Sequence, residues 1–102
     1  MIRWIMFYFY VLRLRGGKLY YGSTGDLRAR VLQHYRGRVK FTSWNRPVQL
    51  VYFEEYTSAV EARERERVAK NHGIRRKTLI DLILEFPPSR LAGFVPAHVR
   101  GT

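Results

Sequence analysis

Two adjacent glycines at positions 16 and 17 constrain the fold of this 102-residue chain more than any other feature. They separate residues 7–15 from residues 18–22, two stretches rich in aromatic side chains, which favour strands. A glycine pair between such stretches is a strong hairpin signal. The fold should therefore begin with two antiparallel strands, and the length gives room for one domain with one modest core.

The rest of the chain carries start and stop signals for three helices and one more strand. We expect helices over residues 27–36, 58–71 and 77–85, a third strand over 48–56, and a polar connection over 38–46. The helix signals are N-cap or capping-box residues at the start and glycine or proline at the end: Asp26 and Gly37, Ser58 and Gly73, and Pro87 after the last helix.

This order of elements, ββαβαα, predicts an α/β (α+β) fold in which helices flank a small three-stranded sheet. No internal repeat or linker divides the chain. We expect one domain over residues 1–86, followed by an irregular tail with proline and glycine over residues 87–102.

The charge of the chain points to a polyanionic partner. Nineteen Lys and Arg against eight Asp and Glu give a formal net charge of +11. Such an excess is typical of proteins that neutralise phosphates and release their counterions. Affinity for an anionic membrane, or a genome rich in arginine codons, would also explain it. We expect nucleic acid as the partner.

The apolar run at residues 4–12 is too short to cross a bilayer, which takes about 20 residues. It also lacks the small-residue cleavage site of a signal peptide. The absence of cysteine removes disulfides and cysteine-based zinc sites, and it fits a reducing compartment. We therefore expect a cytoplasmic protein that does not associate with membranes.

Two polar residues interrupt the apolar face of the first helix. Leu27, Arg30, Val31 and His34 follow the i, i+3, i+4, i+7 spacing of one helix face, and the two aliphatic residues show that this face packs inward. Arg30 and His34 therefore lie on or beside a buried stripe. A functional pair is one interpretation. The other is that the arginine lays its stem along the core and reaches water.

The second helix places one carboxylate among alanines. Ala59, Ala62, Glu66 and Ala69 fall within an arc of about 80° at 100° per residue, and this small-residue face should press against the sheet. An uncompensated buried carboxylate would cost several kcal/mol, so Glu66 requires a cation. Arg30 in a structural ion pair is one candidate, and a divalent metal ion is the other.

These residues, taken in order, resemble the GIY-YIG nuclease family in its short, single-domain bacterial and archaeal branch. The resemblance spans residues 8–80, with Tyr8 in place of the first glycine of the signature. The matching segments are Tyr8-Phe9-Tyr10, Tyr20-Tyr21-Gly22, residues 22–30 leading into Arg30, His34 one turn later, residues 46–52, residues 62–66 and Lys70.

The resemblance implies a metal-dependent endonuclease that hydrolyses phosphodiester bonds in DNA, with branched or damaged DNA among the substrates. Tyr10 or Tyr20 would deprotonate the attacking water or relay its proton, assisted by His34 or the metal. Arg30 would stabilise the developing negative charge. Glu66 would hold one Mg²⁺ or Mn²⁺ ion, with water and phosphate as the other ligands.

Basic residues outside this set are candidates for binding phosphates. They are Arg36, Arg38, Lys40 and Arg46 in or beside the connection after the first helix, and Lys70, Arg75, Arg76 and Lys77 further along. A protein partner could supply targeting. Two alternatives stay open: a non-catalytic nucleic-acid-binding module that retains the nuclease fold, and a structural basic protein of a ribonucleoprotein.

A nuclease site that uses both Tyr10 and Tyr20 requires one particular register of the hairpin. A two-residue turn would pair Arg13 with Tyr20 and put the two tyrosines on opposite faces of the sheet. A three-residue loop over residues 15–17 instead pairs Leu12 with Tyr20 and puts both tyrosines on one face. We predict the three-residue loop, with both hydroxyls opening towards the arginine and the glutamate.

Overall fold

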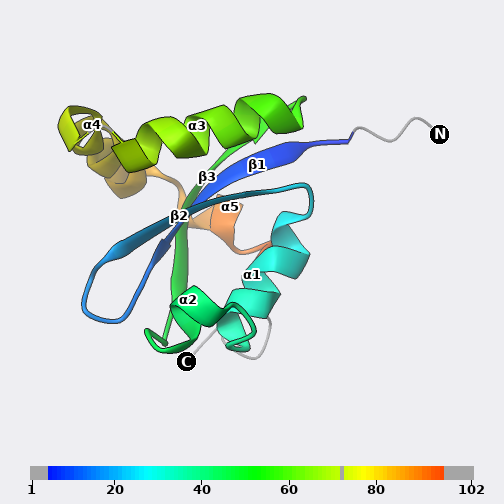
Figure 1. Ribbon diagram of the computed structural model, residues 1–102, viewed down its shortest axis with the longest axis vertical. Helices are drawn as coiled ribbons and strands as arrows, with labels where there is room; N and C mark the ends of the chain where they lie inside the picture. Colours follow the sequence, from blue (N-terminus) through cyan, green and yellow to red (C-terminus); the bar gives the residue numbers. More distant parts are fainter. Residues whose placement is uncertain (1–4, 72, 96–102) are drawn as a thin grey trace.

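The computed structural model describes residues 5–71 and 73–95 of the chain, with the side chains of residues 73–76 left out. Three strands, β1 (Phe7–Arg13), β2 (Leu19–Thr24) and β3 (Gln49–Tyr56), form an antiparallel sheet in the order β2-β1-β3. The central strand β1 is therefore covered by a strand on each side, while β2 and β3 are the two edges (Figure 1).

The β1–β2 hairpin has the predicted three-residue loop. The backbone N–H of Leu14 donates to the carbonyl of Lys18 at 2.8 Å, which leaves residues 15–17 as the loop. Both glycines of the loop have left-handed backbone angles, with φ of +88° and +91°, a region that side chains rarely enter. Leu12 consequently lies opposite Tyr20. The register predicted for a three-residue loop is confirmed.

The first predicted helix is confirmed as α1 (Leu27–Tyr35). Asp26 caps it, because its side chain accepts a hydrogen bond from the backbone N–H of Ala29 at 3.1 Å. Gly37 follows with φ +75°, as expected for a residue that ends a helix. The capping of the second predicted helix is also observed, since the hydroxyl of Ser58 accepts from the N–H of Val60 at 3.1 Å.

The structure adds detail to the later helices. The second is α3 (Ala59–Asn71), and the third, α4 (Gly73–Glu85), begins four residues earlier than predicted. Gly73 is thus the first residue of α4 as well as the expected stop signal for α3. The expected connection over 38–46 contains a single helical turn, α2 (Lys40–Ser43), which is too short to show a periodic pattern in the sequence.

The two faces of the sheet carry different helices. α1 and α2 lie on one side and α3 on the other, as Figure 1 shows. Alternation along β1 buries Tyr10 and Leu12 in the core on the α1 side, and Phe9 and Val11 in the core on the α3 side. The apolar run at the start of the chain is therefore a central strand that is buried on both faces.

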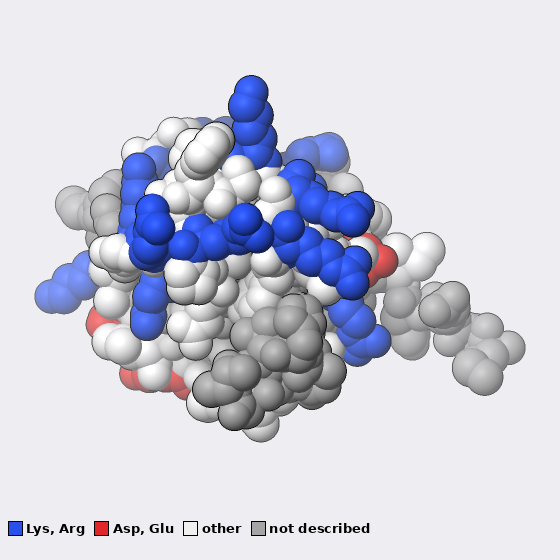
Figure 2. Space-filling model, turned by 90° about the horizontal axis from the view of Figure 1, so that it is seen from below, with Lys and Arg blue, Asp and Glu red and all other residues white. Residues whose placement is uncertain are grey.

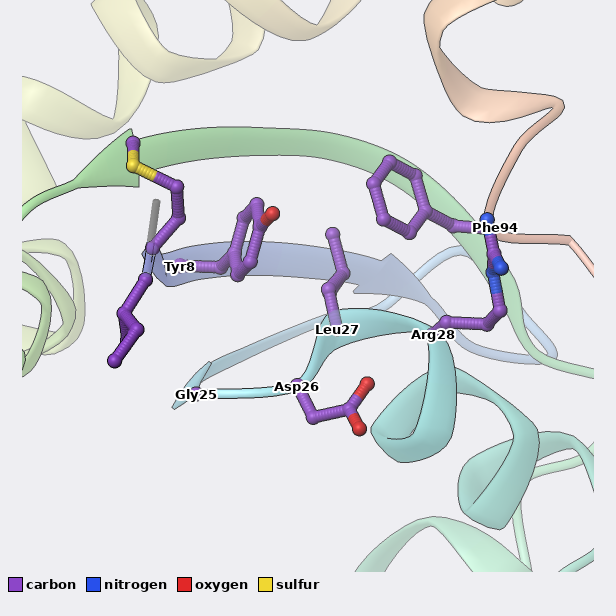
Figure 3. Close-up of a pocket in the computed structure, with 8 residues that line it drawn as sticks. Tyr8, Gly25, Asp26, Leu27, Arg28 and Phe94 are labelled. Carbon is purple, nitrogen blue, oxygen red and sulfur yellow. The ribbon is translucent and has the colours of Figure 1, made fainter. Parts of the chain in front are cut away.

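The described part of the expected irregular tail, residues 87–95, contains a short helix, α5 (Pro88–Leu91), and packs against the sheet. Residues 96–102 of that expected tail lie outside the described residues. The ring of Phe94 lies edge-on to Phe53, with 4.9 Å between centroids, and to Tyr8 at 6.0 Å. Tyr8 from β1, Leu27 from α1 and Phe94 from the tail border a pocket, in which Tyr8 and Phe94 face each other (Figure 3). The tail thus completes the core on the α1 side.

No helix within residues 5–71 and 73–95 is both long and apolar enough to span a membrane.

Candidate active site

Tyr10 lies at the centre of the molecule and is only 1% exposed. Its position on β1 is opposite Gly22 on β2. A Cβ atom at position 22 would lie 2.4 Å from both the hydroxyl oxygen and Cζ of Tyr10. Only glycine therefore lets the tyrosine ring lie this close to the backbone of the neighbouring strand.

The hydroxyl of Tyr10 begins a chain of buried hydrogen bonds. It lies 2.8 Å from Nε2 of His34, whose Nδ1 lies 2.8 Å from Oγ1 of Thr42. The Thr42 hydroxyl donates to the carbonyl of Val39 at 3.3 Å, so its oxygen is free to accept from Nδ1–H. This network assigns the proton of the neutral imidazole to Nδ1 and leaves Nε2 to accept from Tyr10.

Both ends of the Tyr10–His34 bond are neutral at pH 7. Burial, with the charge of Arg30 acting in the same direction, lowers the pKa of the fully buried His34 to about 4. Burial raises the pKa of Tyr10 to about 12, although hydrogen bonding to Arg30 acts the other way. Because the proton of Tyr10 points to His34, the oxygen presents its lone pairs to the arginine.

Arg30 and Tyr20 complete the cluster on this face. Burial lowers the pKa of Arg30, but hydrogen bonding and charge interactions with Tyr10 and Tyr20 outweigh it, so the pKa is raised overall. The ring of Tyr20 lies 5.1 Å from that of His34 and 6.4 Å from that of Tyr10. Unlike Tyr10, Tyr20 is partly exposed. The structure therefore brings four of the predicted residues together.

Glu66 approaches from α3, on the other side of the sheet. Its Oε1 accepts a hydrogen bond from the hydroxyl of Ser23 at 2.7 Å, and its Oε2 pairs with Nζ of Lys70 at 2.6 Å. Its charge contributes to the raised pKa of Tyr10. The cation that the alanine face required is thus Lys70, whereas Arg30 donates to Gln33 at 2.9 Å.

The chemistry of Glu66 fits a hard divalent cation. Its side chain is 22% exposed, and within the described part of the chain no group of three or more His, Asp or Glu could hold a metal ion. Mg²⁺ is commonly held by only one or two carboxylates, together with substrate phosphate and water. Such an ion would have to displace the ammonium of Lys70 from one carboxylate oxygen.

The predicted phosphate-binding residues fall into two groups. Arg36, Arg38, Lys40 and Arg46 are all exposed around α2. Figure 2, which views the molecule from the side of α1 and α2, shows Lys and Arg side chains in a band across this face. Lys70 and Lys77 are exposed on α3 and α4. The side chains of Arg75 and Arg76 lie outside the described residues.

Sequence reasoning missed Thr42 and Ser23, the two hydroxyls that hold His34 and Glu66. Thr42 lies in the single turn of α2, where no periodicity could reveal a buried position. For Ser23 a signal was present. Strand alternation places the neighbour of Gly22 on the opposite face from Tyr20, towards the helix that carries the glutamate.

Residues 6–78 match the model of a family described as the GIY-YIG catalytic domain. The chain belongs to the GIY-YIG family. The matched segment contains the four residues of the cluster, Tyr10, Tyr20, Arg30 and His34, and also Glu66.

Relatives of this GIY-YIG chain include proteins known only as UPF0213. One from Staphylococcus epidermidis is 41% identical over 69 residues, which cover 67% of this chain and 84% of the relative. Another, from Bacillus pumilus, is 40% identical over 73 residues, covering 71% and 74%. The solution NMR structure of a UPF0213 protein from Bacillus halodurans is also similar, with a TM-score of 0.52 and 29% identity, covering 86% of this chain and 94% of that one.

Proposed function

We propose that this GIY-YIG protein is a metal-dependent endonuclease that hydrolyses phosphodiester bonds in DNA. The observation that carries the proposal is the hydrogen-bonded chain from Thr42 through His34 to Tyr10, whose hydroxyl interacts electrostatically with Arg30. A fully buried imidazole with both nitrogens satisfied fixes the tyrosine hydroxyl, and the hydroxyl in turn fixes the guanidinium. Such a preorganised cation beside a tyrosine suits attack on a phosphate.

Arg30 is the residue that stabilises charge. Two hydroxyl oxygens and the amide of Gln33 lie around it, so it is held in place before any substrate binds. Attack on a phosphodiester adds negative charge to the non-bridging oxygens, and a guanidinium in a partly buried site stabilises that charge without reorganising. Loss of one such preorganised donor typically lowers kcat by about 100-fold to 1000-fold.

Tyr20 is the residue that meets the attacking water. It is partly exposed beside Arg30, whereas Tyr10 is buried and its proton is held by His34. As water attacks, its proton passes to the Tyr20 oxygen while Tyr20 gives its own hydroxyl proton to a non-bridging oxygen of the phosphate, and the neighbouring guanidinium stabilises the negative charge on the phosphate oxygens. Tyr10 and His34 are then positioning residues that hold Arg30 in the orientation this step needs.

Glu66 is the residue that would hold Mg²⁺ or Mn²⁺, one ion, at the edge formed by β2. A bound divalent ion supplies Lewis-acid stabilisation of the phosphate and leaving oxygen. Ser23 orients the carboxylate through its hydrogen bond to Oε1. The exposed cations Arg36, Arg38, Lys40 and Arg46 would contact the phosphates that flank the scissile bond, with Lys70, Arg75, Arg76 and Lys77 as a second group.

The test is cleavage of labelled duplex, single-stranded and branched DNA with and without Mg²⁺. We expect metal-dependent cleavage by the wild type, and a loss of several orders of magnitude in Glu66→Gln with DNA binding retained. Glu61→Gln is the matched control, because Glu61 is an exposed carboxylate on the same helix. If the folded wild type binds DNA but cuts none of these substrates, the non-catalytic binding module is the correct alternative.

A second pair of variants tests the role of Tyr20. Tyr20→Phe removes one hydroxyl and should lower the cleavage rate by about 100-fold to 10,000-fold, the usual contribution of a positioned general base. Tyr21→Phe is the control, because Tyr21 stacks on Phe9 in the core on the other face of the sheet. Equal rates for Tyr20→Phe and the wild type would contradict the assignment.

A further inference from the structure

The α2 turn presents two large aromatic side chains to solvent. Phe41 is 61% exposed, and Trp44, the residue that caps the end of α2, is 80% exposed. Neither contributes to the core clusters of the domain, so folding does not explain their position. Exposed tryptophan and phenylalanine on one short segment instead indicate a binding surface.

Trp44 borders an open pocket with mixed apolar and cationic walls. Tyr35, Pro47 and Val48 form its other apolar walls, and Arg15 and Arg46 supply the charge. We call this the Trp44 pocket. Its lining comes from the hairpin loop, the end of α1, the end of α2 and the segment that leads into β3.

Both arginines of the Trp44 pocket are held in place. Arg15 donates from Nη2 to the carbonyl of Trp44 at 3.2 Å, and Arg46 donates from Nε to the carbonyl of Ser43 at 3.2 Å. A Cβ atom at position 37 would lie 2.5 Å from Cζ of Arg46, so Gly37 makes room for the guanidinium. Each arginine keeps further N–H groups for a ligand.

The segment that supplies most of the pocket carries charges of one sign. Between Asp26 and Glu54 the sequence holds no acidic residue, while it holds six Lys and Arg. This segment includes α1, α2 and the start of β3, and Figure 2 shows the resulting band of basic side chains across the face. An occupant with aromatic and anionic groups complements such a surface, and a nucleotide has both.

The aromatic surface leads to the candidate active site. The ring of Phe41 lies 5.6 Å from that of Tyr20, which lies 5.1 Å from that of His34. Trp44 follows Phe41 by three residues along the same turn. A nucleic-acid strand that passes the candidate active site can therefore continue over α2 into the Trp44 pocket.

We propose that the Trp44 pocket binds an unpaired base of a single-stranded nucleic acid, next to the bond that is cut. Cationic side chains can contact the backbone of duplex DNA, but the bases of a duplex are stacked inside the double helix and cannot stack on an exposed indole. An unpaired base can stack on Trp44 while Arg15 and Arg46 contact its phosphates. The inference rests on the proposed nuclease function and assigns its substrates to the class with a single-stranded segment.

The test measures binding without cleavage, in EDTA and at one fixed salt concentration. The probes are a 15-nucleotide oligo(dT), a 15-nucleotide oligo(rU), and a 15-base-pair duplex. We expect Trp44→Ala to weaken binding of at least one single strand by about tenfold, a typical loss when one stacking aromatic is removed. Binding of the duplex should change by less than about twofold.

Two further variants keep this test decisive. Trp44→Phe retains a stacking ring, so it should bind the single strand nearly as well as the wild type but lose the fluorescence quenching that the single strand causes. Leu84→Ala is the matched control, because Leu84 is 75% exposed on α4, away from the pocket. A thermal melt of each variant verifies that it is folded.

Three outcomes would overturn the inference: unchanged single-strand affinity in Trp44→Ala, an equal loss for single strand and duplex, or no quenching that depends on Trp44. Preference between oligo(dT) and oligo(rU) identifies the sugar. None of these measurements depends on Glu66 or on cleavage. A chain that cuts DNA but fails here loses only the pocket assignment, and a chain that stacks bases but cuts nothing loses only the proposed activity.

Discussion

Replacement of Gly22 by alanine tests the geometry of the cluster with a single methyl group. The added Cβ would lie 2.4 Å from Cζ and the hydroxyl oxygen of Tyr10, about 1 Å closer than ordinary carbon contacts allow. Neither side can yield easily, because the glycine is in a paired strand and the tyrosine ring is buried. The ring must therefore move and stretch its 2.8 Å bond to His34.

The size of the effect follows from two contributions. Overpacking of a core by one methyl group costs about 1–3 kcal/mol, and a weakened bond to a buried imidazole adds about 1 kcal/mol or more. We expect Gly22→Ala to lower the free energy of unfolding by about 2–4 kcal/mol, which corresponds to a Tm lower by roughly 8–20 °C in a domain of this length. In the proposed mechanism Tyr10 positions Arg30, so cleavage should fall by about 100-fold as well.

The assays are urea denaturation and cleavage under conditions in which the variant is folded. Gly93→Ala is the control, because a Cβ at that position meets no atom within 4 Å. If Gly22→Ala unfolds within about 0.5 kcal/mol of the wild type and cuts DNA normally, the tyrosine does not lie against the strand as described, and the positioning argument fails.

Three other perturbations have defined outcomes. The pKa of His34 is about 4 in the folded chain against an ordinary 6.5, so the unfolded chain binds a proton more readily as the pH falls. The free energy of unfolding, measured by urea denaturation, should therefore fall by about 3 kcal/mol from pH 6.5 to pH 4. His34→Gln should reduce this dependence on pH. Lys70→Met removes the ammonium from Glu66 and should tighten Mn²⁺ binding, measured by electron paramagnetic resonance, about twofold to fivefold; weaker binding would show that the lysine assists the ion. Neutralisation of the exposed Arg38 should lower the slope of log K against log salt by about one unit, and an unchanged slope would place the phosphates elsewhere.

The fold could be predicted wherever a local signal decided the structure. The glycine pair, the Asp26 and Ser58 caps and the apolar run of β1 each determine an element through neighbours in sequence. The single turn of α2 escaped because one turn has no period. The docked tail escaped because Phe94 reaches its partners, Tyr8 and Phe53, only through long-range packing.

The candidate site divides in the same way. His34 and Arg30 stood out because they are polar residues on an apolar helix face, and both lie beside the tyrosines in the structure. The partner of Glu66 could not be chosen from sequence, since Arg30, Lys70 and a metal ion all satisfy the same electrostatic requirement. The structure places Lys70 there, one helical turn from the carboxylate.

The candidate site depends on whether the hairpin loop has an odd or an even number of residues. Side chains alternate along a strand, so a shift of one residue in the β1–β2 pairing would move Tyr20 to the α3 side while Tyr10 stayed on the α1 side. Deletion of one loop glycine invites that shift, yet it touches no residue of the cluster and leaves the composition of the strands unchanged. The length of this loop thus determines whether the two tyrosines share a face of the sheet, although a Cβ atom added at either loop glycine would meet no atom within 4 Å.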